Sequence, residues 1–247
     1  MHLSTRFNGA IACVALAAVF ATPSIASAAG TGDGPKTTRD VLTRTQAVRK
    51  AGDEGVTKRT LASKVIAQAI DAPFKFLWTP THEQERSYWC APATVQVIDD
   101  YFGTPCSQQT YANYMGTSAS GTDFSRVDDA LRHYTGKSYY YYGGLSKATL
   151  RPKIFDTLYV HGQPLAADLR IDASAWPNYV YDHDGHIIPI EGFDWRSSTE
   201  PIRINDVYDE AGSRAGGGST LGHRTYTYSV IWDGVGSHPR KAVVAAP

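Results

Sequence analysis

Cys90 is the residue of this sequence whose type and position most directly suggest chemistry. It stands just ahead of residues 91–102, which carry apolar side chains at helical spacing, a proline in the first turn and a glycine beyond the end. This pattern predicts a buried helix with both ends marked. Unpaired amides and the helix dipole at a helix start favour an anion, and therefore the thiolate form of a cysteine placed there. We predict that Cys90 is a nucleophile, with a buried structural thiol as the alternative.

An attacking thiolate creates an oxyanion, which needs hydrogen-bond donors in fixed positions. The amides at the predicted helix start can supply one donor. The side-chain amide of Gln84, six residues before Cys90, can supply a second. We therefore predict that Gln84 contributes to an oxyanion hole.

The nucleophile also needs a base, and His186 is the best placed histidine. A turn at residues 182–185 delivers it to the first position of the apolar run at residues 187–190, which is predicted to be a strand. A base at the end of a rigid strand has the fixed geometry that proton transfer requires. The remaining histidines beyond residue 28 lie in loop-like or helical contexts: His82, His133, His161, His183, His223 and His238.

A third residue should hold the imidazole in one tautomer and stabilise its protonated form. Residues 202–206 alternate like a strand that could pair beside the His186 strand, and they end in Asn205 and Asp206. Both side chains can accept a hydrogen bond from a ring N–H. We predict Asp206 for this role, with Asn205 as the second candidate and an ordinary turn as the alternative.

The elements that must position these residues fall into two halves. Helices are predicted at residues 91–102, after Ser107, from Ser125 and over residues 146–160, and strands at residues 138–142, 164–170, 186–193 and 201–206. Residues 226–232 fit either a strand or a helix. Helices followed mainly by strands predict an α+β domain whose two layers meet at a cleft.

The beginning of the sequence has the pattern of an export signal. Residues 9–21 form a short apolar run, and Ala26-Ser27-Ala28 has small residues where a signal peptidase reads. We predict a signal peptide at residues 1–28, an N-terminal extension or inhibitory pro-segment at residues 29–75, and a domain at residues 76–247. The protein is then exported, and either stays in the cell wall or leaves the cell.

Two cysteines, Cys90 and Cys106, remain after predicted signal cleavage. The helix between them would separate their sulfur atoms by about 18 Å, whereas a disulfide needs Cα atoms within about 7 Å. We therefore expect two thiols rather than a Cys90–Cys106 disulfide.

Composition excludes some partners. Lys and Arg number 24, as do Asp and Glu, so the net charge of zero argues against nucleic acid or an anionic membrane surface as a partner. No stretch is long enough for stable membrane insertion after signal cleavage. The cluster at residues 182–186 is explained by a turn more simply than by a metal site, and no cofactor is predicted.

These motifs, in this order, resemble the papain-like cysteine peptidases, in the branch that processes the double-glycine leaders of bacteriocins. The resemblance spans about half the chain, from Gln84 to Asp206. Its pieces are Gln84 with Cys90, Trp89-Cys90-Ala91-Pro92-Ala93, Cys106-Ser107-Gln108, residues 112–117, Gly121-Thr122, Gly185-His186 with residues 187–194, and Asn205-Asp206.

The resemblance implies a papain-like fold, in which a helix bearing the nucleophile packs on a C-terminal antiparallel sheet. It also implies the roles of nucleophile, oxyanion donor, base and orienting residue for Cys90, Gln84, His186 and Asp206. The chain departs from the family pattern at Ala91, where glycine is usual, and at Val207, where proline is usual. We expect no attached transporter, and therefore expect that leader processing at a membrane exporter does not carry over.

We therefore predict a secreted cysteine peptidase that hydrolyses peptide bonds of a peptide or protein substrate through a thioester on Cys90. Two alternatives stay open. One is a non-catalytic secreted binding module on the same fold, and the other is acyl transfer to amines, as in a transglutaminase.

Overall fold

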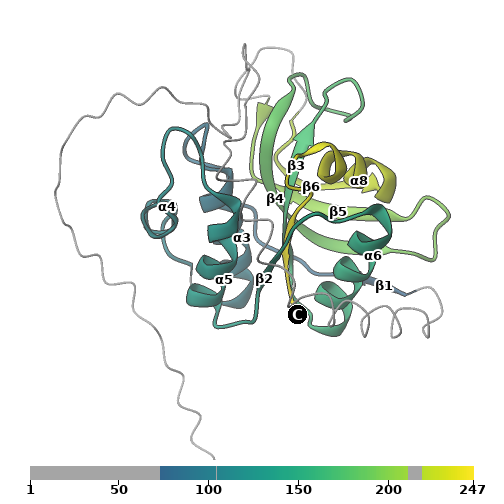
Figure 1. Cartoon of the computed structure of the whole chain (residues 1–247), viewed down its shortest axis with the longest axis horizontal. Helices are drawn as coiled ribbons and strands as arrows, with labels where there is room; N and C mark the ends of the chain where they lie inside the picture. The colour runs from purple at the N-terminus through teal and green to yellow at the C-terminus, as the bar shows by residue number, and fades with distance from the viewer. Residues whose placement is uncertain (1–72, 104, 211–218) are drawn as a thin grey trace, which may run out of the picture.

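The computed structural model describes residues 73–247 apart from residue 104 and residues 211–218. The predicted signal peptide and all but the end of the predicted extension or pro-segment lie outside the described residues. In the described part, a group of helices and an antiparallel sheet lie side by side (Figure 1). The α+β class predicted from the sequence is confirmed.

The sheet contains all seven strands of the described residues, and every pairing is antiparallel. Its order is β2-β7-β3-β4-β5-β6, and β1 pairs with the second half of the long strand β4. The strands are β1 (Phe74–Phe76), β2 (Tyr140–Tyr142), β3 (Leu165–Ile171), β4 (His183–Asp194), β5 (Pro201–Asp206), β6 (Gly222–Thr227) and β7 (Val243–Ala245).

Helices pack on both faces of this sheet. On one side lie α3 (Cys90–Phe102), α4 (Gln108–Met115) and α5 (Val127–Thr135), and on the other lie α6 (Lys147–Phe155) and α8 (Tyr228–Ser237) (Figure 1). Two short turns complete the helical part, a 3-10 turn at Phe124–Arg126 and a π-helical turn at Asp156–Val160.

The two faces of the sheet bury two separate apolar clusters. The first contains Leu169, Ile188 and Ile204 with side chains of α6 and α8. The second contains Ala166 and Ile187 with side chains of α3, α4 and α5. Alternating residues of one strand enter different clusters because successive strand side chains point to opposite faces. The central strands β3 and β4 are therefore covered on both sides, which explains the apolar runs at residues 165–167 and 187–190.

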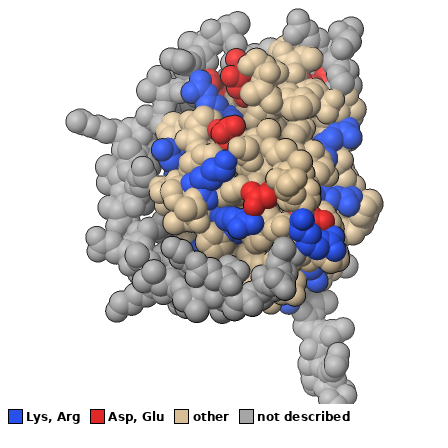
Figure 2. Space-filling model, turned by 90° about the vertical axis from the view of Figure 1, so that its right-hand side faces the viewer, with Lys and Arg blue, Asp and Glu red and all other residues tan. Residues whose placement is uncertain are grey.

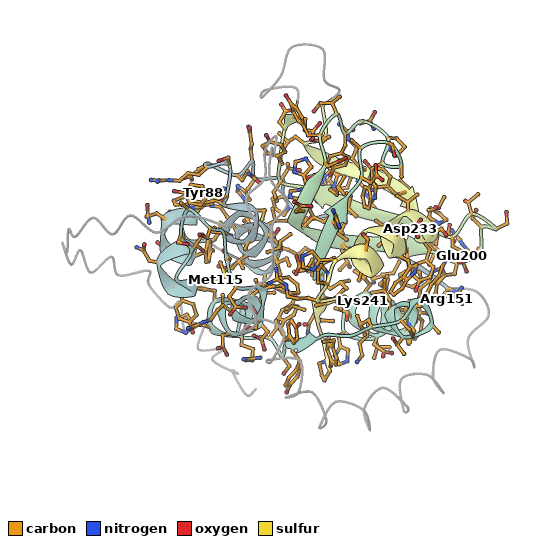
Figure 3. All side chains as sticks on the ribbon, turned by 45° about the horizontal axis from the view of Figure 1, so that its top comes forward. Tyr88, Met115, Arg151, Glu200, Asp233 and Lys241 are labelled. Atoms are coloured by element: carbon orange, nitrogen blue, oxygen red, sulfur yellow. The ribbon has the colours of Figure 1, made fainter. Side chains whose placement is uncertain are left out.

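The periphery of the fold is charged but mixed in sign. Figure 2 shows Lys and Arg side chains scattered among acidic and uncharged ones on the face it presents. At one end of the molecule, the Arg151 guanidinium lies 2.7 Å from the Glu200 carboxylate (Figure 3). Both side chains of this pair are more than one-third exposed, so it contributes little to stability.

Several predicted elements differ in detail from the observed ones. Cys90 is the first residue of α3 and does not precede the helix. The segment at residues 226–232 is strand and helix in turn, because the Thr227 side chain caps α8 by accepting a hydrogen bond from the Val230 amide. The helix predicted from Ser125 is α5, which begins at Val127, and Asp123 caps the 3-10 turn before it.

The two cysteines of the domain also differ from each other. Cys90 keeps its thiol, whereas Cys106 is disulfide-bonded. The expectation of two thiols therefore holds for Cys90 and is wrong for Cys106. A Cys90–Cys106 disulfide is excluded, in agreement with the distance that α3 puts between them.

Candidate active site

Cys90 begins α3 on the side of the helix that faces the sheet. Its side chain is almost completely buried, and the helix has no acidic residue in its first turn. Among the described residues, no side chain caps this helix end. The dipole of α3 therefore favours an anion at its start, such as a thiolate or the oxyanion of a reaction intermediate.

His186 and Asp206 lie on the neighbouring strands β4 and β5. Their side chains are fully buried, and the distance between His186 Nε2 and Asp206 Oδ1 is 2.8 Å. A carboxylate can only accept, so Nε2 carries the proton of this hydrogen bond. Nδ1 is then the ring nitrogen that can take up a proton from another group.

Two further donors hold the Asp206 carboxylate. The Tyr208 amide donates to Oδ1 at 3.0 Å, and the Tyr179 hydroxyl donates to Oδ2. Burial, reinforced by the charge of Asp206, raises the pKa of Tyr179 well above its ordinary value. The hydroxyl therefore keeps its proton and remains a donor, which fixes the orientation of the carboxylate toward His186.

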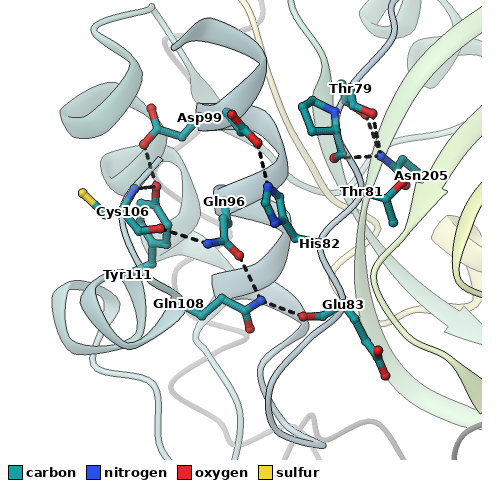
Figure 4. Close-up of polar contacts among 12 residues, drawn as sticks. Thr79, Thr81, His82, Glu83, Gln96, Asp99, Cys106, Gln108, Tyr111 and Asn205 are labelled. Carbon is teal, nitrogen blue, oxygen red and sulfur yellow. Dashed lines mark hydrogen bonds and ion pairs between the residues drawn. The ribbon is translucent and has the colours of Figure 1, made fainter. Parts of the chain in front are cut away.

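Asn205 points away from His186 and binds the segment that follows β1. Its amide group donates to the Thr79 carbonyl at 3.1 Å, to the Thr79 hydroxyl at 2.8 Å and to the Pro80 carbonyl at 3.1 Å. Its carbonyl oxygen accepts from the Thr81 hydroxyl at 2.9 Å (Figure 4). Of the two candidates, Asp206 contacts His186 and Asn205 anchors a loop.

A side-chain hydrogen bond joins α3 to β4 close to the site. The Thr94 hydroxyl donates to the Ile187 carbonyl at 2.7 Å, and both residues are buried. Thr94 lies one helical turn after Cys90, and Ile187 directly follows His186. The bond therefore ties the helix that begins with Cys90 to the strand that carries His186.

Gln84 is linked to the same place through its backbone. Its amide donates to the carbonyl of Val207 at 2.7 Å, and Val207 directly follows Asp206. The side-chain amide of Gln84 donates to the Arg86 carbonyl at 3.0 Å. Since a carboxamide has two N–H groups, the second can serve a bound carbonyl.

Gln108 holds the loop that carries Gln84. Its side-chain oxygen accepts from the Glu85 amide at 2.9 Å, and its amide group donates to the Glu83 carbonyl at 2.7 Å and to the Gln96 side chain at 3.0 Å. Figure 4 shows this bridge between α4, α3 and the loop. The residues on both sides of Gln84 are thus fastened to the helical layer.

The four residues predicted from the sequence are therefore connected by one closed series of contacts. Helix α3 leads from Cys90 to Thr94, the Thr94–Ile187 bond leads to His186, and the His186–Asp206 bond leads to β5. Val207 then returns the series to Gln84. Cys90, Ile187 and Val207 also share one buried cluster. The arrangement can support attack by a thiolate, with a histidine to move the proton and a carboxylate to orient the histidine.

Sequence reasoning did not identify the roles of Thr94, Tyr179 and Gln108. Thr94 offered a signal, since it is a polar residue on the apolar face of the predicted helix. Gln108 stands in the Cys106-Ser107-Gln108 piece of the family resemblance, but that piece does not show its role. Tyr179 offered no signal, because its partner is distant in sequence and is chosen only by folding.

The acidic and histidine residues at the start of β4 each have a separate partner. Asp182 Oδ1 accepts from the Ala173 amide at 2.9 Å, Asp184 lies 3.1 Å from Arg170, and His183 contacts Glu210. Within the part of the chain that the structure describes, no three His, Cys, Asp or Glu side chains form a potential metal site. No described helix is long and apolar enough to cross a membrane.

The comparison with protein families adds an independent observation. The profile of the Peptidase_C39 like family matches residues 74–229, which include all four predicted site residues. This chain belongs to the Peptidase_C39-like family. It is therefore a cysteine peptidase, and its helical layer and antiparallel sheet form the papain-like fold predicted from the sequence.

Solved structures of peptidases show distant similarity to this C39-like chain. A double-glycine-motif protease from an AMS/PCAT transporter, solved with its leader peptide, is 13% identical, with a TM-score of 0.47 over 69% of this chain and 92% of the other. A putative C39-like peptidase from Bacillus anthracis is 13% identical, with a TM-score of 0.45 over 71% and 98%. The cysteine protease xylellain from Xylella fastidiosa is 11% identical, with a TM-score of 0.47 over 91% and 99%.

Similarities of this size carry no information about the substrate of this C39-like chain. A search of curated proteins gave no match.

Replacement of Thr94 by valine tests the bond between α3 and β4. Thr94→Val removes the donor to the Ile187 carbonyl, and the loss of a buried hydrogen bond should lower the free energy of unfolding by about 1–3 kcal/mol. Thr94→Ser keeps the hydroxyl and should retain more of the stability. Denaturant unfolding measures both variants, and equal stability of Thr94→Val and the parent protein would contradict the role of this bond.

Replacement of Asn205 and Asp206 separates the anchor from the site. Asn205→Ala removes the hydrogen bonds to residues 79–81 and should destabilise the fold by about 1–3 kcal/mol, while the pH dependence of Cys90 alkylation stays unchanged. Asp206→Asn should change that pH dependence. Unfolding curves and alkylation rates measure the two effects, and the reverse pattern would show that Asn205 is the residue acting on His186.

Proposed function

We propose that this chain is an exported cysteine peptidase in which Cys90 is the nucleophile, His186 the base and Asp206 the residue that orients the base. The observation that carries the proposal is the His186–Asp206 hydrogen bond of 2.8 Å on strands tied to the helix that begins with Cys90. Membership of the Peptidase_C39-like family supports the same chemistry. The substrate is a peptide or protein.

The reaction begins with transfer of the Cys90 thiol proton to Nδ1 of His186. The imidazolium is stabilised by the carboxylate of Asp206, and the thiolate by the start of α3. The thiolate attacks the peptide carbonyl carbon, and the carbonyl oxygen becomes an oxyanion. The Cys90 amide and the second N–H of Gln84 donate to this oxyanion.

Collapse of the intermediate completes the first half of the reaction. The carbon–nitrogen bond breaks, His186 gives its proton to the leaving amine, and a thioester remains on Cys90. His186 then takes a proton from water, which attacks the thioester, and the thiol is released with a carboxylic acid product. The proton that Cys90 gave up leaves with the amine, and His186 passes the proton taken from water to the Cys90 sulfur, so the enzyme is restored after one turnover.

The two departures from the family pattern lie beside the nucleophile and the orienting residue. Ala91 and Val207 are both fully buried in the same apolar cluster as Cys90. Neither removes a reacting group or a hydrogen bond named above. Their packing is therefore compatible with the proposed mechanism.

Alkylation of Cys90 tests the nucleophile and its base. In the full chain, iodoacetamide should modify Cys90 well below the pH at which an ordinary thiol with a pKa of about 8.5 reacts, because His186 takes the thiol proton. The pH dependence is the measurement, since restricted access of the reagent to Cys90 lowers the rate without moving the pH at which the thiolate forms. His186→Ala should shift the dependence to that of an ordinary thiol, and His133→Ala, in a helix outside the site, is the matched control.

Unchanged labelling in His186→Ala would contradict the assignment of the base.

Cleavage of a peptide library tests the reaction. The parent protein should release new amino termini, detected by mass spectrometry, and Cys90→Ala should release none while keeping the unfolding midpoint of the parent. Turnover by Cys90→Ala would rule out the thioester mechanism. An activated Cys90 without any cleavage would favour a binding module, and amide products formed with an added amine would favour acyl transfer.

Sequencing of the exported protein tests the predicted signal peptide. Expression of the full chain in a secreting host should give a product that begins at residue 29, because Ala26 and Ala28 occupy the positions read by signal peptidase. Intracellular protein that still begins at Met1 would contradict export. A product beginning near residue 76 would instead support removal of a pro-segment.

A further inference from the structure

A second histidine–carboxylate pair lies beside the first and has no part in the proposed reaction. His183 Nε2 lies 2.7 Å from Glu210 Oε1, and both side chains are fully buried. Burial of an ionisable pair is costly unless further hydrogen bonds support it. The cost of burying a second such pair next to the site therefore suggests that the pair has a function.

The two pairs are in direct contact. The ring centroids of His183 and His186 are 5.5 Å apart. The Tyr208 ring packs edge-on against both histidines, at 5.6 Å from His183 and 6.3 Å from His186. The Tyr179 ring does the same, at 5.6 Å and 6.5 Å. Any movement of His183 would thus be transmitted to the surroundings of His186.

Each of three segments supplies one group to the His186–Asp206 pair and another to the His183–Glu210 pair. Strand β4 supplies the two histidines, and residues 206–210 supply the two carboxylates. Tyr179 and Val180 supply one donor each. The Tyr179 hydroxyl binds Asp206, while the Val180 amide donates to Glu210 Oε2 at 2.5 Å. Glu210 therefore holds Val180, which directly follows Tyr179, the donor to Asp206.

The connection before Tyr179 needs such an anchor. Asn178 has a φ of 76°, in the left-handed region that non-glycine residues seldom adopt. A conformation of this kind persists only where the surrounding contacts determine it. Glu210 is itself fixed, because its own amide donates to the Thr220 hydroxyl at 3.1 Å and that hydroxyl donates to the Tyr208 carbonyl.

We propose that Glu210, together with His183, is a positioning residue of the active site. It holds Val180 so that the Tyr179 hydroxyl stays on Asp206, and Asp206 in turn keeps His186 in the tautomer with the proton on Nε2. Neither His183 nor Glu210 touches the substrate. This inference rests on the proposed function for its consequence in catalysis, but the positioning itself can be measured without turnover.

A double-mutant cycle tests whether Glu210 acts through Tyr179. Tyr179→Phe and Glu210→Ala should each slow Cys90 alkylation at mildly acidic pH by about tenfold. The double variant should be no slower than the slower single variant, because both changes remove the same hydrogen bond to Asp206. Glu210→Gln keeps an oxygen acceptor for the Val180 amide and should retain most of the parent rate.

Additive losses in the cycle would overturn the proposal, as would a loss in Glu210→Gln equal to that in Glu210→Ala. The cycle is repeated with His183→Gln in place of Glu210→Ala, so that one variant that fails to fold does not decide the outcome. The same lack of additivity with Tyr179→Phe is expected, and additivity would again overturn the role of the pair.

Nitrogen NMR of the His186 ring separates this proposal from the proposed function. In a Cys90→Ala background, the ring should carry its proton on Nε2, and Glu210→Ala should mix the two tautomers while Glu210→Gln should not. An unchanged tautomer in Glu210→Ala would overturn the positioning role even if peptide cleavage is established. A mixed tautomer would support the role even if the protein cleaves no peptide.

Discussion

The attachment of α3 to β4 is the constraint on which the candidate site depends. Cys90 lies in the helical layer, whereas His186 and Asp206 lie in the sheet, so no local sequence interaction can bring them together. The Thr94 hydroxyl and the Ile187 carbonyl make this connection one turn from Cys90 and one residue from His186. Apolar packing of α3 against Ile187 and Val207 supplies the driving force, and the hydrogen bond determines the register.

Buried polar groups around this junction are arranged so that most have specific partners. The Asp206 carboxylate accepts from a histidine, a tyrosine and a backbone amide. Asn205, its neighbour, satisfies its own side chain with the loop at residues 79–81. Because an unpaired polar group in an apolar interior is costly, each of these residues specifies one arrangement of the strands around it. The site thus contributes to the uniqueness of the fold as well as to chemistry.

The support of the site extends beyond the residues that would touch a substrate. Gln108 fastens the residues on both sides of Gln84, and Tyr179 fastens Asp206. The His183–Glu210 pair lies outside these contacts and holds the segment that delivers Tyr179. Catalytic geometry requires side chains whose positions are locked by such neighbours. The cost of burying a second ionisable pair is understandable if the pair keeps the first in one orientation.

The sequence by itself determined the elements and the candidate residues that depend on local patterns. The helix that carries Cys90, the apolar part of β4 that follows His186 and the alternating strand that ends in Asp206 follow from periodicity and from turn residues, whose effects extend over only a few positions. The choice of Asp206 over Asn205 as the partner of His186 was a prediction from the sequence. Both side chains were chemically able to accept a hydrogen bond from the histidine ring.

Only the tertiary structure decided which of these two residues faces the histidine, because successive side chains of a strand point in opposite directions and strand pairing sets which one turns inward. It also decided that Thr94, Gln108 and Tyr179 hold the site and that His183 pairs with Glu210. These partners lie far apart in the sequence, and their contacts arise from the packing of layers, which no local pattern encodes.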